Sequence, residues 1–148
     1  MPWVAAFGAA GQLVRRVPER ARPFVPSAGC ALLAAAYFAI SAALFGDRHG
    51  EALLLVVLAA GGLGLGIGFN TQIVHLTGSV EAEYAPDISG TSTTLTQIGG
   101  AAGVAAFAGA YLSLAPHGHG DRAFAITCLA MAVGAGVAVV AARRALRA

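Results

Sequence analysis

The sequence predicts an all-α integral membrane protein, with four transmembrane helices and a partial helix before them. Four apolar runs contain no Asp, Glu, Lys or Arg, and each is long enough to cross a bilayer, whose core of about 30 Å takes roughly 20 helical residues. Charged residues make up 11% of the chain, against about 25% in soluble domains. The two-residue alternation of membrane barrels is absent. We expect the helices at residues 24–45, 52–76, 88–114 and 123–142.

Residues 1–14 are apolar but too short to span a bilayer. A signal peptide begins with cations and ends at a small-residue cleavage site, whereas here Arg15 and Arg16 follow the apolar stretch. We therefore expect the last half of a helix that enters the cytoplasm. A short amphipathic or disordered N-terminus is the alternative.

The placement of charge predicts the orientation. All nine cations are arginines, and seven of them lie before the first span or after the last, in a basic loop at 15–23 and a tail at 143–148. The positive-inside rule then makes both termini cytoplasmic in a multi-pass protein of the cell (plasma) membrane. With four spans, the acidic loop at 78–87 must also be cytoplasmic. It does not support this orientation, but it is weak evidence against it because acidic residues contribute little to the positive-inside rule.

Small residues in the second and third spans predict helix interfaces, since close packing drives helix association in lipid. Gly62 and Gly66 form one four-residue pair in the second span, and Gly64 and Gly68 form another. Spacings of three and four place a longer stripe on one side of the third span, where we expect a neighbouring helix. The stripe consists of Ser92, Thr96, Gly99, Gly103, Ala106 and Ala110.

Polar side chains cluster near the inner end of the second span. Polar groups at membrane depth usually face a bundle interior or a water-filled cavity, so Asn70, Gln72 and His75 are candidates for lining a substrate path. The alternative is that they cap neighbouring helices or reach the depth of the lipid headgroups.

The sequence does not indicate an enzyme or a nucleic-acid-binding protein. It shows no nucleophile–base pair, no phosphate-binding loop and no basic face, and we expect no cofactor. Cys30 and Cys128 lie in apolar spans, where thiols act as small hydrophobic groups. His117 and His119 could touch a metal, but two ligands in a glycine-rich loop are more typical of a solvated loop.

Two segments resemble the major facilitator superfamily. The first, residues 11–20, is similar to the family's cytoplasmic loop motif Gly-x-Leu-x-Asp-Arg-x-Gly-x-Arg. Arg15 stands in place of the acidic residue, and Pro18 in place of the second glycine. The matching residues are Gly11, Leu13, Arg16 and Arg20.

The second segment, residues 85–105, resembles the penultimate helix of the multidrug efflux branch, the fourteen-helix drug:proton antiporters. A proline-containing loop leads to Ser89 and Gly90, and then to a run similar to Gln-x-Gly-Gly-x-x-Gly-x-Ala. The resemblance implies that this run packs helices together. Its glutamine and glycines are Gln97, Gly99, Gly100 and Gly103.

The resemblance covers nearly the whole chain and implies the last four helices of such a transporter's C-terminal half, preceded by the end of another helix. It implies export of a small-molecule substrate by alternating access, with the remaining helices and the lipid bilayer as partners. Because four helices are fewer than one rocking half, we expect a C-terminal fragment of a longer protein. The alternative is a stand-alone four-helix protein that associates with its own copies or with a partner in a structural or regulatory role.

Overall fold

The computed structural model describes residues 2–46, 50–78, 80, 81, 83–115 and 120–145. Among them are five α-helices and one 3-10 helix: α1 (Pro2–Arg15), η1 (Glu19–Phe24), α2 (Val25–Phe45), α3 (Glu51–Gly78), α4 (Ala85–Leu114) and α5 (Gly120–Ala145). Four of these, α2 to α5, are long and apolar enough to cross a membrane, which indicates an integral membrane protein. Their bounds agree with the four expected spans to within three residues at each end.

Local chemistry accounts for the ends of α1, α2 and α5. After Arg15, Pro18 lacks the N–H that a continuing helix needs, so α1 closes in a tighter turn in which Arg16 N donates to Leu13 O over 3.0 Å. Pro26 stands in the first turn of α2, where its fixed φ suits a helix start. In α5 the first turn carries an acidic residue and the last turn carries two arginines, which matches the helix dipole.

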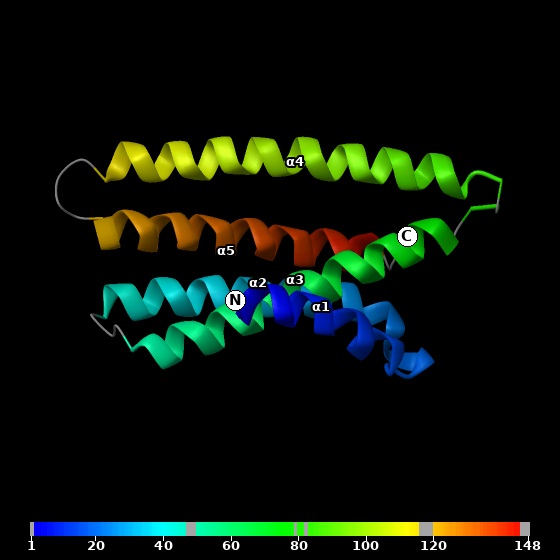
Figure 1. Cartoon of the computed structure of the whole chain (residues 1–148), viewed down its shortest axis with the longest axis horizontal. Helices are drawn as coiled ribbons and strands as arrows, with labels where there is room; N and C mark the ends of the chain where they lie inside the picture. The colour runs from blue at the N-terminus through cyan, green and yellow to red at the C-terminus, as the bar shows by residue number, and fades with distance from the viewer. Residues whose placement is uncertain (1, 47–49, 79, 82, 116–119, 146–148) are drawn as a thin grey trace.

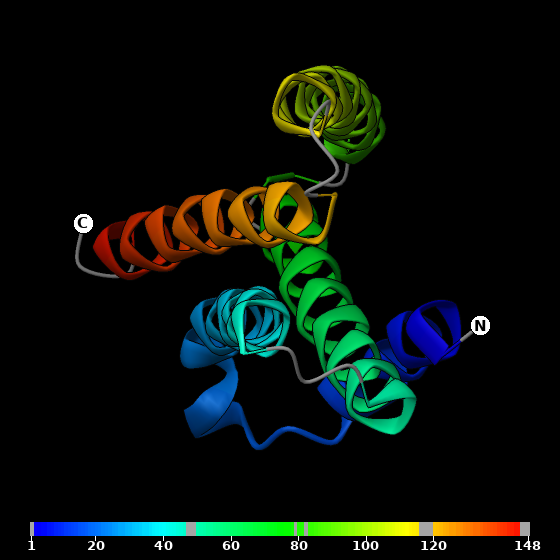
Figure 2. The ribbon, with the colours of Figure 1, turned by 90° about the vertical axis from the view of Figure 1, so that its left-hand side faces the viewer.

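The helices form a bundle from which α4 stands apart. Helix α2 packs against both α3 and α5, and α1 packs against α3. Helix α4 lies alongside the other helices in the view of Figure 1 but is oblique to α5 in that of Figure 2, and it touches α3 and α5 only sparsely, so a gap separates its ribbon from the others. Helix α1 begins about halfway along α3 and therefore covers only part of it (Figure 1).

One face of α3 packs against the backbone of α1. A Cβ atom added to Gly62 would lie 2.5 Å from the carbonyl oxygen of Trp3, and one added to Gly66 would lie 2.7 Å from that of Phe7. The ring of Phe69 also meets the ring of Phe7, with centroids 6.3 Å apart. The pair Gly62 and Gly66 therefore lies at the α1–α3 contact.

A second face of α3 packs equally closely against α2. A Cβ atom added to Gly64 would lie 2.7 Å from the backbone nitrogen of Leu33, and one added to Gly29 would lie 2.6 Å from the nitrogen of Gly68. The two backbones therefore meet with no side chain between them, as is common where membrane helices cross through small residues.

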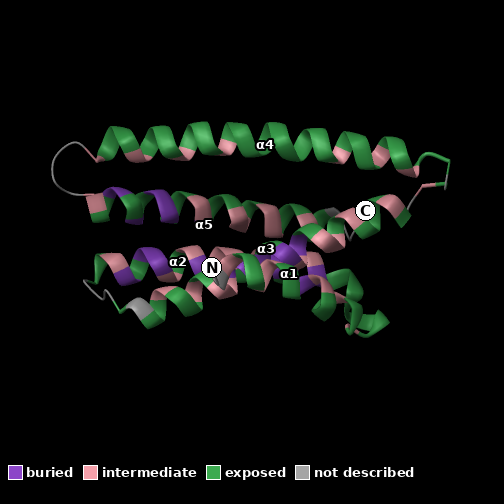
Figure 3. Ribbon diagram, viewed as in Figure 1, coloured by how far each residue is buried: buried purple, intermediate pink, exposed green. Residues whose placement is uncertain are grey.

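Burial follows the same division of the molecule. The buried apolar residues are mostly alanines of α2 and α5, with Ile40 and Cys128 among them. None of the described residues of α4 is buried, and most of them are exposed to whatever surrounds the chain (Figure 3). The other helices approach one another closely at small residues, whereas no described helix packs as closely against α4.

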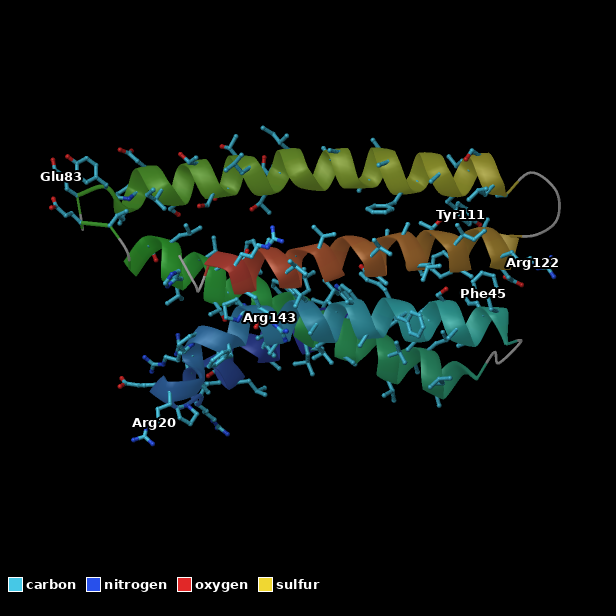
Figure 4. The ribbon with its side chains drawn as sticks, turned by 180° about the vertical axis from the view of Figure 1, so that it is seen from behind. Arg20, Phe45, Glu83, Tyr111, Arg122 and Arg143 are labelled. Atoms are coloured by element: carbon cyan, nitrogen blue, oxygen red, sulfur yellow. The ribbon has the colours of Figure 1, made fainter. Side chains whose placement is uncertain are left out.

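The up-and-down order of the helices sorts the charged residues to two ends. Arg20 in η1 and Glu83 before α4 lie at one end, and Arg143 lies towards that end (Figure 4). Arg122 lies at the opposite end of the bundle, as do Phe45 and Tyr111 (Figure 4). We call the first the arginine-rich end.

Candidate functional site

The polar cluster of α3 lies in its C-terminal half, and two of its side chains bond within the helix. The Asn70 side-chain nitrogen donates to Gly66 O over 2.7 Å, and Thr71 Oγ1 donates to Ile67 O over 2.7 Å. Both residues are half-buried. A polar side chain that bonds to its own helix satisfies its donor without a neighbouring helix.

The side chains of Gln72 and His75 are exposed, and neither side chain forms a hydrogen bond with a described residue. Gly68 lies opposite the first turn of α2, since an added Cβ would be 3.9 Å from Pro26 O. At 1.5 Å per residue, Gln72 is about 6 Å and His75 about 10 Å further along the axis of α3. The two side chains therefore lie at or beyond the level where α2 begins, at the arginine-rich end.

Helix α4 presents a run of polar side chains in its first half. The hydroxyls of Thr93, Thr94 and Thr96 each donate to the carbonyl one turn earlier, over 2.7 to 3.0 Å. Gln97, near the middle of the helix, is exposed, and its side chain has no hydrogen-bond partner among the described residues. Its carboxamide is thus a polar group at mid-span depth that the described chain leaves unsatisfied.

The expected interface of α4 is not formed within the described chain. No atom lies within 4 Å of a Cβ added to Gly99, Gly100 or Gly103, apart from the helix's own backbone and chain neighbours. The aromatic contact between α4 and α5 is at the far end, where the rings of Tyr111 and Phe124 meet edge to face at 6.3 Å. The expectation of a helix against this stripe is therefore not met by any described element.

Gln97, which the resemblance implies to be a packing residue, is exposed among the described residues, so its packing role stays a prediction.

The residues of the loop motif lie where α1 ends. Gly11 and Leu13 belong to the last turns of α1, Arg16 follows it, and Arg20 lies in η1. Both arginines are exposed. The ion pair among the described residues of this segment joins Arg22 to Glu19 at 3.8 Å, and it too is exposed.

The described residues contain no group of three or more His, Cys, Asp or Glu side chains able to hold a metal ion. His117 and His119 lie outside the described residues. Searches of known protein families, curated proteins and solved structures found no match to this chain.

Proposed function

We propose that the chain is part of a secondary active transporter of the major facilitator type that exports amphipathic small molecules in exchange for protons. The resemblance of residues 11–20 and 85–105 suggests the family, and one structural observation supports the proposal. Helix α4 is of spanning length, yet it presents an unpartnered carboxamide, Gln97, and an uncovered stripe of small residues. Such a helix requires further helices or a polar ligand beside it.

The surroundings of α4 determine whether the amide of Gln97 finds a hydrogen-bond partner. Burying an amide in an apolar medium without a hydrogen bond costs a few kcal/mol, and polar groups at membrane depth usually face a bundle interior. Lipid tails offer Gln97 no partner, and they gain little from an uncovered glycine face. A larger helical bundle around an aqueous path would satisfy both.

The polar end of α3 supplies the substrate contacts in this proposal. Gln72 has an amide that no described residue engages, and Asn70 lies half-buried two residues earlier. Both would line the mouth of a cavity that opens at the arginine-rich end. There the amides would bond to polar groups of an amphipathic substrate.

The test is efflux of ethidium from cells that express the chain from its own genomic locus. Gln72→Ala should slow efflux by about three- to tenfold, the loss expected for one hydrogen bond. The matched control is Gln12→Ala, which removes an exposed amide from α1. The amount of each variant in the membrane is measured in parallel. Unchanged efflux of ethidium and other amphipathic cations after deletion of the chain contradicts the proposal.

The uncovered face of α4 also favours a second function, that of a small membrane protein that associates with its own copies. Cysteine at Gly99, in a background with Cys30→Ala and Cys128→Ala, separates the two by oxidative crosslinking in membranes. A covalent dimer of the chain supports self-association. If no dimer forms and deletion of the chain reduces efflux, the transporter is supported.

A further inference from the structure

A groove runs along the second half of α5, on a face that no other described helix covers. It has a volume of about 480 Å³ and opens outward. Helix α5 runs obliquely to α4, so this half diverges from it (Figure 2). The lining residues are Val133, Gly136, Val137, Val140, Ala141 and Arg144.

The lining residues follow helical periodicity and differ in chemistry along the groove. They recur at spacings of three and four, so they form a single face of α5. The absence of a side chain at Gly136 hollows this face, and nothing lies within 4 Å of a Cβ added there, apart from α5's own backbone and Gly136's chain neighbours. All the lining is apolar except at one end, where Arg144 contributes a guanidinium.

The length of the groove corresponds to one leaflet of a bilayer. From Val133 to Arg144 the helix rises about 16 Å, whereas half of the hydrocarbon core measures about 15 Å. Val133 lies at the middle of α5, and the candidate span ends at Arg144. The apolar end is therefore at the bilayer centre and the cation is at headgroup depth.

We propose that this groove binds an anionic phospholipid from the leaflet at the arginine-rich end. One acyl chain would lie along the valines and over Gly136, and the phosphate would accept hydrogen bonds from Arg144. Arg144 forms no ion pair with any described residue, so its guanidinium has donors to offer. Arginine binds phosphate through two parallel hydrogen bonds, and basic pockets at membrane helices recognise anionic headgroups.

Charge complementarity favours a lipid over a protein helix as the occupant. A helix seated on this face would pair with Arg144 only if it carried an acidic group at the right height, whereas an anionic lipid places its phosphate at that height in any such membrane. The inference requires membrane insertion but does not depend on transport.

The test is native mass spectrometry of the full-length chain in mild detergent, titrated with phosphatidylglycerol or with phosphatidylcholine of the same acyl chains. The unmodified chain should bind phosphatidylglycerol more tightly. Arg144→Ala should weaken that binding about tenfold, as for loss of one charge-assisted hydrogen bond. Gly136→Leu should weaken binding of both lipids, because the side chain fills the groove.

Two matched controls make the result specific. Arg143→Ala removes the same charge from the same turn but not from the groove, and Gly134→Leu adds the same side chain at an exposed glycine outside it. Both should bind lipid as the unmodified chain does. Equal losses for Arg143→Ala and Arg144→Ala would indicate general surface attraction and overturn the proposal.

A third variant tests the alternative occupant. Cysteine at Val137, in the background without Cys30 and Cys128, should remain uncrosslinked on oxidation in membranes if lipid fills the groove. Efficient formation of a covalent dimer, or of an adduct with one membrane protein, would show that a helix occupies the groove and would overturn the proposal.

Discussion

Gly29 and Gly64 lie within helices, as Gly99 and Gly134 do, but the two pairs have different surroundings. At Gly29 and Gly64 an added Cβ atom would lie within 3 Å of the backbone of the facing helix. At Gly99 and Gly134 nothing lies within 4 Å of such an atom beyond the helix's own backbone and chain neighbours. A substitution that lengthens the side chain by one methyl group will therefore have opposite consequences at the two kinds of position.

Gly64→Ala should destabilise the chain by about 1–3 kcal/mol, because the new methyl group forces α2 and α3 apart. Gly99→Ala should leave stability unchanged or raise it by up to about 1 kcal/mol, as helix propensity predicts where no contact is lost. The measurement is unfolding in mixed micelles by titration with sodium dodecyl sulfate, followed by circular dichroism. Equal stability of the two variants would show that α2 and α3 do not approach as described.

At the scale of the helices, hydropathy located the four spans because the bilayer fixes how long an apolar run must be. The spacing of Gly62, Gly64, Gly66 and Gly68 indicated two packed faces on one helix, and the structure places α1 and α2 there. The spacing did not reveal which helix would pack on each face, because a face of small residues can accept the backbone of any helix. Nor could it place α4, whose small face meets no described helix.

The candidate site was less predictable for a related reason. The sequence identifies polar side chains within apolar spans, but their height and partners depend on where neighbouring helices start. Asn70 bonds to its own helix, whereas Gln72 and His75 lie at the level where α2 begins. The position of Gln72 and His75 relative to the start of α2 depends on where α2 and α3 cross, at Gly29 and Gly68. The sequence of α3 alone does not reveal this crossing point.

The contact between α1 and α3 can be followed through the chain's single tryptophan. Trp3 lies against Gly61 and Gly62, so Gly62→Val should push α1 away from α3. Lipids with brominated acyl chains should then quench Trp3 fluorescence more strongly, because lipid reaches the ring. Gly134→Val is the control, since it lies on a different helix with open space around it. Identical quenching in both variants would contradict the packing of α1 on α3.

The position of α4 beside α5 depends on few contacts, among them the aromatic pair at one end. Such a pair contributes about 0.5–1.5 kcal/mol in addition to the free energy from burying its surface. Where few other contacts join two helices, this is a large part of the free energy that holds them together. Tyr111→Ala should therefore broaden the distance distribution between spin labels at Ala105 and Ile126, measured by double electron–electron resonance. Tyr84→Ala removes an exposed ring elsewhere and should not change it. A sharp, unchanged distribution for Tyr111→Ala would mean that other contacts hold α4.

For the whole molecule, the segregation of arginines predicts how the chain sits in the membrane. The segments around Arg20 and Glu83 share one end of the bundle, and Arg122 lies at the other (Figure 4). By the positive-inside rule we therefore expect the arginine-rich end to lie in the cytoplasm.

Single cysteines in the background without Cys30 and Cys128 test this orientation. A membrane-impermeant maleimide should label Asp121→Cys in intact cells, and should label Ala21→Cys and Glu83→Cys only after permeabilisation. All three positions are exposed, so a difference in labelling reports the side of the membrane. The reverse pattern would mean that the chain is inserted the other way round.

The backbone contact between α2 and α3 also limits how the gene can change. Every glycine codon begins with two guanines, so a single-base change that alters the amino acid introduces either a residue with a Cβ atom or a stop codon. At Gly29 and Gly64 every such residue would place a Cβ atom within 3 Å of the facing backbone, which costs stability. Selection for stability should therefore disfavour amino-acid changes at positions 29 and 64 more strongly than at position 134, where the space is open. The crossing of the two helices thus limits what these two codons can encode, whichever substrate or partner the protein serves.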